Sequence, residues 1–192
     1  MQTFDENTFN SDWVSYWSLL TELNLSQFFD EEKLMEDLKR SPGALTEDTG
    51  LAYPGALLRH IRLSTLIVER IAKIINGTYE IDFNSLRKVC SLMHLSKIEM
   101  FVRNDNAWEI EKRGMNYKFT VIDGCLKAGE RSILNAMNSG IKFNAIEFEA
   151  MKAMDKDSED FSSSKYFNNI MTVIIRQAND LAYMIAKEKN KK

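Results

Sequence analysis

The sequence predicts an all-α helical bundle that carries one small irregular β-hairpin. Apolar side chains recur at helical spacing along most of the 192 residues, and only two prolines and eight glycines interrupt them. One segment instead gathers aromatic and β-branched residues between turn-like stretches, which is typical of short strands. We expect residues 1–44 to form a helical extension that packs on a helical domain of residues 45–192.

The extension is predicted to contain two helices. An aromatic stripe predicts the first helix over residues 11–24, with Ser11 or Asp12 as its N-cap. A second helix is expected over residues 30–40. The connector "SPGALTEDTGLAYPG" follows, and it breaks the helical pattern because it contains both prolines and three of the glycines.

Both histidines are associated with predicted helices. The clearest helix covers residues 55–76, where one stripe is apolar, the opposite stripe is charged, and His60 lies at the edge of the apolar one. The next helix begins after Asp82, a favourable N-cap, and continues through Met93. His94 follows on the flank of its apolar face. Both imidazoles are therefore expected to point toward the interior.

The second half of the chain begins with the strand-like segment. Residues 99–121 predict the irregular hairpin, because "RNDN" and "EKRG" have the composition of turns. Helices are then predicted over residues 124–138, 145–154 and 164–188. The stretch "DKDSEDFSSS" before the last helix lacks the central glycine and the final glutamate of a calcium loop, so we interpret it as a solvated loop.

The composition argues against several functional classes. A formal net charge of −3 and a pI near 5.5 give no general attraction to nucleic acid or to acidic membranes. No segment reaches the roughly 20 apolar residues of a membrane span, and the polar, acidic first residues do not resemble a signal peptide. Cys90 and Cys125 form no CxxC pair and are expected to be reduced, buried thiols. These features predict a cytoplasmic protein.

Four strings resemble segments of the HD-domain metal-dependent phosphohydrolases, in particular their bacterial and phage branch. "YPGALLRHIRLS" resembles the start of the helix that carries the first metal histidine, and "SLMHLSKIEMF" resembles the segment with the paired His-Asp. "LKAGERSILNAMNSG" is similar to the "GHGExS" helix start, and "IIRQANDLAYM" is similar to the last metal-ligand helix. The four strings keep the family's order over residues 45–185. The resemblance implies an HD-domain-like bundle, in a family whose members cleave phosphate esters or nucleotides.

Most of the family's metal-binding side chains are missing at the matching positions. His60 matches the first metal histidine and His94 the histidine of the pair. The paired aspartate is absent: either Leu95 stands in its place, or one residue is deleted and "LSK" stays in register. Ala128 replaces the histidine of "GHGE", and Asn179 replaces the terminal aspartate. Two neutral imidazoles without carboxylates hold a divalent cation weakly. The sequence therefore predicts no metal, no cofactor and no metal-dependent hydrolysis.

Two functional hypotheses of different classes follow. The first is a non-catalytic binding or interaction module, whose cleft takes a small molecule or a protein partner. The second is a phosphohydrolase that recruits Asp180, Asp155 or Glu130 as substitute ligands beside the two histidines. The metal content of the purified protein distinguishes the two.

A third hypothesis is a cleft that binds a nucleotide without cleaving it, held by Lys97, Arg131 and Arg176. Two satisfied core histidines and a solvated lysine explain the same pattern without any ligand. The ten methionines and the aromatic first helix fit burial, a protein partner or a homodimer equally well. The candidate ligand-binding residues of the cleft are His60, His94, Lys97, Glu130, Arg131, Arg176, Asn179 and Asp180.

Overall fold

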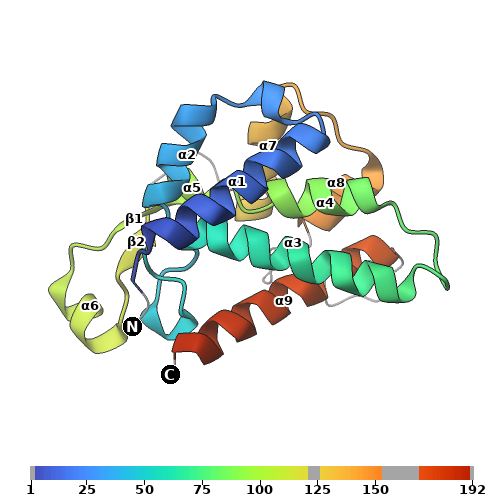
Figure 1. The fold of residues 1–192 in the computed structure, drawn as a ribbon. Helices are drawn as coiled ribbons and strands as arrows, with labels where there is room; N and C mark the ends of the chain where they lie inside the picture. Colours follow the sequence, from blue (N-terminus) through green and yellow to red (C-terminus); the bar gives the residue numbers. More distant parts are fainter. Residues whose placement is uncertain (1–2, 121–125, 153–168, 191–192) are drawn as a thin grey trace.

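Two long helices form the centre of the molecule. α3 (Ala56–Ile75) and α9 (Ile170–Asn190) lie side by side (Figure 1), and α3 buries the apolar stripe that its spacing predicts. The computed structural model describes residues 3–120, 126–152 and 169–190. No helix within these ranges is long and apolar enough to cross a membrane.

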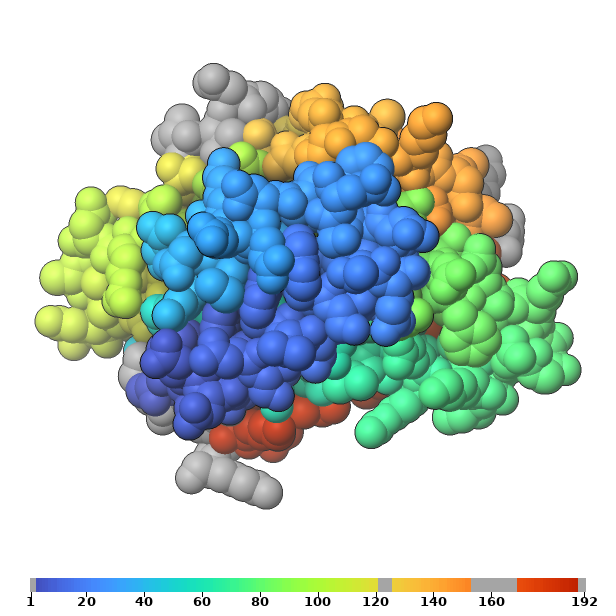
Figure 2. All heavy atoms as spheres, turned by 45° about the horizontal axis from the view of Figure 1, so that its top comes forward, coloured from blue at the N-terminus to red at the C-terminus, as the bar shows by residue number. Residues whose placement is uncertain are grey.

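The two N-terminal helices cover one face of the molecule (Figure 2). α1 (Glu6–Glu22) and α2 (Glu31–Arg40) contribute side chains to the same hydrophobic cluster as α3. The predicted start of the first helix at residue 11 is wrong, because Asp5 is its N-cap and accepts hydrogen bonds from the N–H groups of Asn7 and Thr8.

Three further helices complete the bundle: the first packs on α3, the third packs on α9, and the second contacts the other two. They are α4 (Phe83–Leu92), α7 (Ala128–Asn138) and α8 (Ala145–Lys152), and the single turn α5 (Lys97–Met100) follows α4. Two 3₁₀ turns, η1 (Ser26–Phe28) and η2 (Glu47–Thr49), lie in the connections. The predicted acidic loop with Asp155 and the thiol of Cys125 lie outside the described residues.

The strand-like segment forms the small sheet that the sequence predicts, but a helix joins its strands. β1 (Phe101–Arg103) pairs antiparallel with β2 (Tyr117–Phe119), and α6 (Ala107–Arg113) connects them. The two predicted turns are the ends of α6. Asn106 caps its first turn, and Gly114 ends it in the left-handed region at φ 60°.

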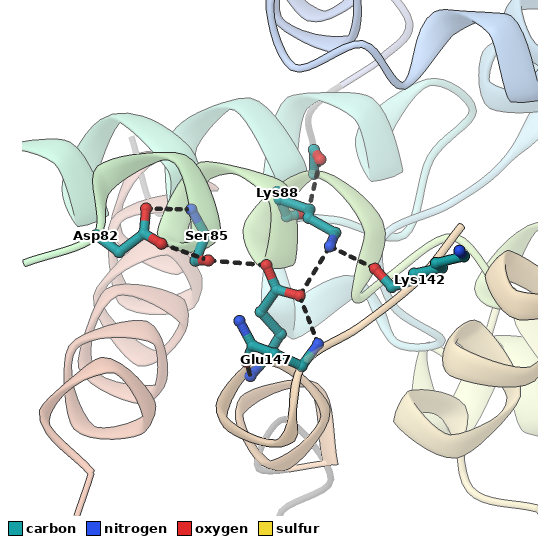
Figure 3. A network of polar contacts seen from close by, with 7 residues as sticks. Asp82, Ser85, Lys88, Lys142 and Glu147 are labelled. Carbon is teal, nitrogen blue, oxygen red and sulfur yellow. Dashed lines mark hydrogen bonds and ion pairs between the residues drawn. The ribbon is translucent and has the colours of Figure 1, made fainter.

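A buried charge network joins α4 to α8 (Figure 3). Glu147 is 4% exposed, and its carboxylate accepts a 2.7 Å hydrogen bond from Lys88 Nζ. Ser85 Oγ lies between Asp82 and Glu147, 2.9 and 2.8 Å from their oxygens. Lys88 also donates to the backbone carbonyl of Lys142. The network satisfies charges that burial would otherwise make costly.

Removal of the Glu147 carboxylate should destabilise the fold. Glu147→Ala is expected to lower the free energy of unfolding by about 2 kcal/mol, less than the roughly 3 to 5 kcal/mol of a fully buried pair. The loss should be smaller than for a fully buried pair because the Lys88 side chain is 18% exposed and keeps its hydrogen bond to the Lys142 carbonyl. Urea unfolding measures the change. Asp105→Ala, which breaks the exposed pair with Lys118, is the control and should leave the unfolding midpoint unchanged; an equal effect of both variants would contradict the role of burial.

Candidate functional site

Three side chains from distant parts of the chain meet at one oxygen atom. The Nε2 groups of His60 and His94 both donate hydrogen bonds to Asn179 Oδ1, at 2.8 and 2.9 Å. All three side chains are buried, with exposed fractions of 0%, 1% and 4%. The centroids of the two imidazole rings are 4.6 Å apart, in an edge-to-face arrangement. We call this cluster the His–Asn–His site.

Each side chain of the site is placed by a different element. His60 lies on the buried face of α3, and Asn179 lies on the face of α9 that packs against α3. His94 lies in the turn after α4, which Ser132 of α7 fixes from both sides. Ser132 Oγ donates to the Met93 carbonyl and accepts from the Ser96 N–H, at 3.0 and 3.1 Å.

The geometry sets the protonation of the two rings. Because the Asn179 oxygen only accepts, both imidazoles carry a proton on Nε2. Burial lowers the pKa of His94 well below its ordinary value, and the positive charge of Lys97 and the neighbouring His60 lower it further. His94 is therefore neutral near pH 7. Its Nδ1 is buried without a hydrogen-bond partner in the described part of the chain.

Lys97 lies beside the His–Asn–His site and is buried. The side chain is 6% exposed, so the interpretation of a solvated lysine is wrong. Its Nζ donates to the hydroxyl of Tyr183 at 2.7 Å and to the carbonyl of Gly43 at 3.1 Å. The ammonium also lies 5.4 Å from the Tyr183 ring centroid and 5.8 Å from that of Phe101, within cation–π range.

Tyr183 links the lysine to the histidines. Its ring centroid is 4.2 Å from that of His60, and its hydroxyl accepts from Lys97. The sequence interpretation missed this residue. Its signal is the spacing of four residues from Asn179, which puts both on one face of α9.

A cavity of about 600 Å³ opens beside these residues. Its wall brings together the loop before α3, the turn after α4, both strands and the start of α7. His60 itself lies in the wall of a separate cavity of about 350 Å³, which residues of α1 also line. Because the larger cavity contains Lys97, Asn179 and His94 in its wall, we take it as the candidate binding site. The described residues around the larger cavity are Gly43, Ala44, Leu45, Thr46, Thr49, His94, Lys97, Met100, Phe101, Phe119, Lys127, Ala128, Asn179 and Tyr183.

The other predicted site residues lie away from this wall. Glu130 accepts from the Lys127 N–H at 3.2 Å and faces Lys152 at 3.7 Å, so it serves the start of α7. Arg131 is 8% exposed, and Arg176 and Asp180 are half-buried on α9. None of these four residues is part of the described cavity wall.

The donor atoms of the His–Asn–His site do not fit a catalytic divalent metal. Both Nε2 atoms carry protons that are donated to an amide oxygen, and that oxygen is neutral. Within the described ranges, no three His, Cys, Asp or Glu side chains lie close enough together to hold a metal ion. Two imidazoles and one amide supply no negative charge to balance a divalent cation.

Cys90 offers no alternative nucleophile. The thiol is fully buried in the hydrophobic core, and burial raises its pKa strongly.

No protein-family model, curated protein or solved structure matches the chain. Support for a function comes from the geometry of the His–Asn–His site and from the four resembling strings.

Removal of the shared acceptor should destabilise the protein. Asn179→Leu leaves two buried N–H donors unsatisfied, at about 1 to 3 kcal/mol each, so the free energy of unfolding should fall by about 3 kcal/mol. Chemical unfolding followed by circular dichroism measures the loss. Gln177→Leu, at an exposed position on the same helix, is the control. A change of less than about 0.5 kcal/mol for Asn179→Leu would contradict the hydrogen-bond geometry.

The low pKa of His94 predicts a stability that decreases in mild acid. Below about pH 6.5, His94 of the unfolded chain takes up a proton, whereas buried His94 of the folded chain stays neutral. Unfolding is therefore favoured as the pH falls. The slope should reach up to about 1.4 kcal/mol per pH unit for this one group. Urea unfolding between about pH 7 and 5 tests it. His94→Gln, which keeps an N–H donor but cannot titrate, should show a shallower slope, and an unchanged slope would exclude His94 as the cause.

Proposed function

We propose that this chain is a non-catalytic relative of the HD-domain phosphohydrolases that binds a small molecule without a metal. The observation that carries the proposal is the shared hydrogen bond of His60 and His94 to Asn179. It occupies the Nε2 atom of each ring, so a metal at that position would have to displace both hydrogen bonds. The cavity beside it remains large enough for a ligand of ordinary metabolite size.

The meeting of three sequence-distant residues supports the family part of the proposal. His60, His94 and Asn179 occupy positions that match metal ligands in three of the four resembling strings. Their convergence at 2.8 and 2.9 Å is what descent from a common ligand set would leave behind.

The chemistry of the site supports the absence of catalysis. An amide does not titrate, and the Nε2 protons of both rings are committed to it, so neither ring is set up to accept a proton from water through that nitrogen. Glu130, one proposed substitute ligand, is held by the Lys127 N–H and faces Lys152. Neither the Nε2 atoms of the two rings nor Glu130 is therefore arranged as a general base for hydrolysis of a phosphate ester.

Composition supports a place in the cytoplasm. The free thiol of Cys90 is buried and has no disulfide partner among the described residues, and a reducing compartment suits it.

The ligand enters from solvent at the cavity between the loop of residues 43–49 and the sheet.

The metal content of the purified protein tests the proposal. Wild-type protein prepared without metal-affinity resin should contain less than about 0.1 equivalent of manganese, iron, nickel or zinc by mass spectrometry, because it lacks a charged ligand set. It should also leave phosphomonoesters and nucleotides uncleaved when manganese is added. Stoichiometric metal bound to the wild type would refute the proposal.

Asn179→Asp is the matched variant. It restores a carboxylate of almost the same shape between the two imidazoles, and the added negative charge should increase the affinity for divalent cations at least about tenfold. Titration with Mn²⁺ or Zn²⁺ compares the two proteins. Equal, tight binding by both would show that the amide is not what excludes the metal.

A further inference from the structure

The cavity beside Lys97 has a basic wall in an acidic protein. Among the described residues of this wall, Lys97 and Lys127 are basic and none is acidic. The whole chain instead has 28 acidic and 25 basic side chains. This local reversal of charge favours an anion in the cavity.

Lys97 has the surroundings of an anion anchor. Its ammonium donates to two neutral oxygens, those of Gly43 and Tyr183, and forms no ion pair within the described chain. A buried charge without a counter-ion is costly. A negatively charged ligand group would supply the missing counter-ion in a place where water screens little.

The start of α7 adds to the positive potential. Lys127 and Ala128 are part of the cavity wall at the N-terminus of this 11-residue helix, where the backbone N–H groups carry a partial positive charge. Glu130 in the first turn offsets part of it and in turn faces Lys152. The helix end therefore assists Lys97, which is the main anchor because it is buried.

The rest of the wall suits a flat apolar group. Phe101 of β1 and Phe119 of β2 are cross-strand partners with ring centroids 5.3 Å apart, and Met100 lies beside them. Phe119 is 59% exposed, which leaves its ring available at the cavity wall. A volume of about 600 Å³ exceeds what a bare inorganic anion would fill.

We infer that the cavity binds an organic anion, with one negatively charged head at Lys97 and a planar apolar body against Phe101 and Phe119. The inference depends on the proposed function, metal-free binding of a small molecule, and names the class of ligand. Carboxylate and phosphate monoester heads share the required chemistry, a cluster of negatively charged acceptor oxygens.

Calorimetry on the full chain with four probes tests the inference. The probes are 1-naphthoate, 1-naphthyl phosphate, the neutral 1-naphthalenemethanol, and inorganic phosphate. At least one aromatic anion should bind about tenfold or more tightly than the neutral alcohol and than inorganic phosphate, because only it uses both the charge and the apolar wall. The stronger of the two aromatic anions identifies the head group.

Lys97→Met should weaken the preferred anion about ten- to a hundredfold and leave the neutral alcohol unchanged. Lys73→Met, at an exposed position on α3, is the control and should have no effect. If Lys97→Met does not fold, Lys97→Arg replaces it; this variant keeps the charge and should bind the anion within a few-fold of wild type. The wild-type affinities for the anion and the alcohol then show whether the cavity prefers the anion.

Equal affinity for anion and alcohol would overturn the inference while the proposed metal-free binding function stands. The absence of heat from every probe at millimolar concentration would also overturn the inference. Stoichiometric metal in the wild-type protein would overturn the proposed function itself, so the two failures are distinguishable.

Discussion

The side-chain oxygen of Asn179 is the constraint on which the rest of the site depends. It accepts hydrogen bonds from two imidazoles that arrive from α3 and from the turn after α4, so one atom joins three segments of the chain. A carboxylate in that position would give the cluster a negative charge and a reason to hold a cation. The amide instead closes the cluster with neutral groups. The same two histidines that suggest a metal centre in the sequence are thereby turned into a buried hydrogen-bonded element of the core.

The neutral cluster leaves Lys97 as the dominant charge in its surroundings. Tyr183 connects the two, because its ring lies against that of His60 and its hydroxyl accepts a hydrogen bond from Lys97. The ammonium in turn helps to keep His94 uncharged, since it lowers the pKa of that imidazole. Positive charge is thus concentrated at the wall of the cavity, where a ligand can reach it, and not inside the cluster.

Local patterns predicted the helices well, and they predicted contacts less well. The apolar stripe of α3 and the N-cap at Asp82 are visible in the sequence, and both are found. The segments "RNDN" and "EKRG" were interpreted as turns, because the residues that favour turns also cap helices, as Asn106 and Gly114 do for α6. Asp5 as the first cap was missed for a related reason, since Ser11 and Asp12 are equally good caps by composition.

The candidate site was predicted in part. Family resemblance selected His60, His94 and Asn179, which do come together, but helical spacing alone could not show that they share one atom. Burial of Lys97 depends on Gly43, more than fifty residues away in sequence, and no local pattern carries that contact. Arg131 and Arg176 were grouped with Lys97 by charge alone, and the structure places neither at the cavity wall.

Nitrogen-15 NMR of the imidazole rings tests the central claim most directly. At neutral pH, the spectrum should show a proton on Nε2 of both rings and a neutral His94, and addition of Zn²⁺ should leave these signals unchanged. A proton on Nδ1 of either ring, or a shift of both rings on addition of one equivalent of zinc, would contradict the account.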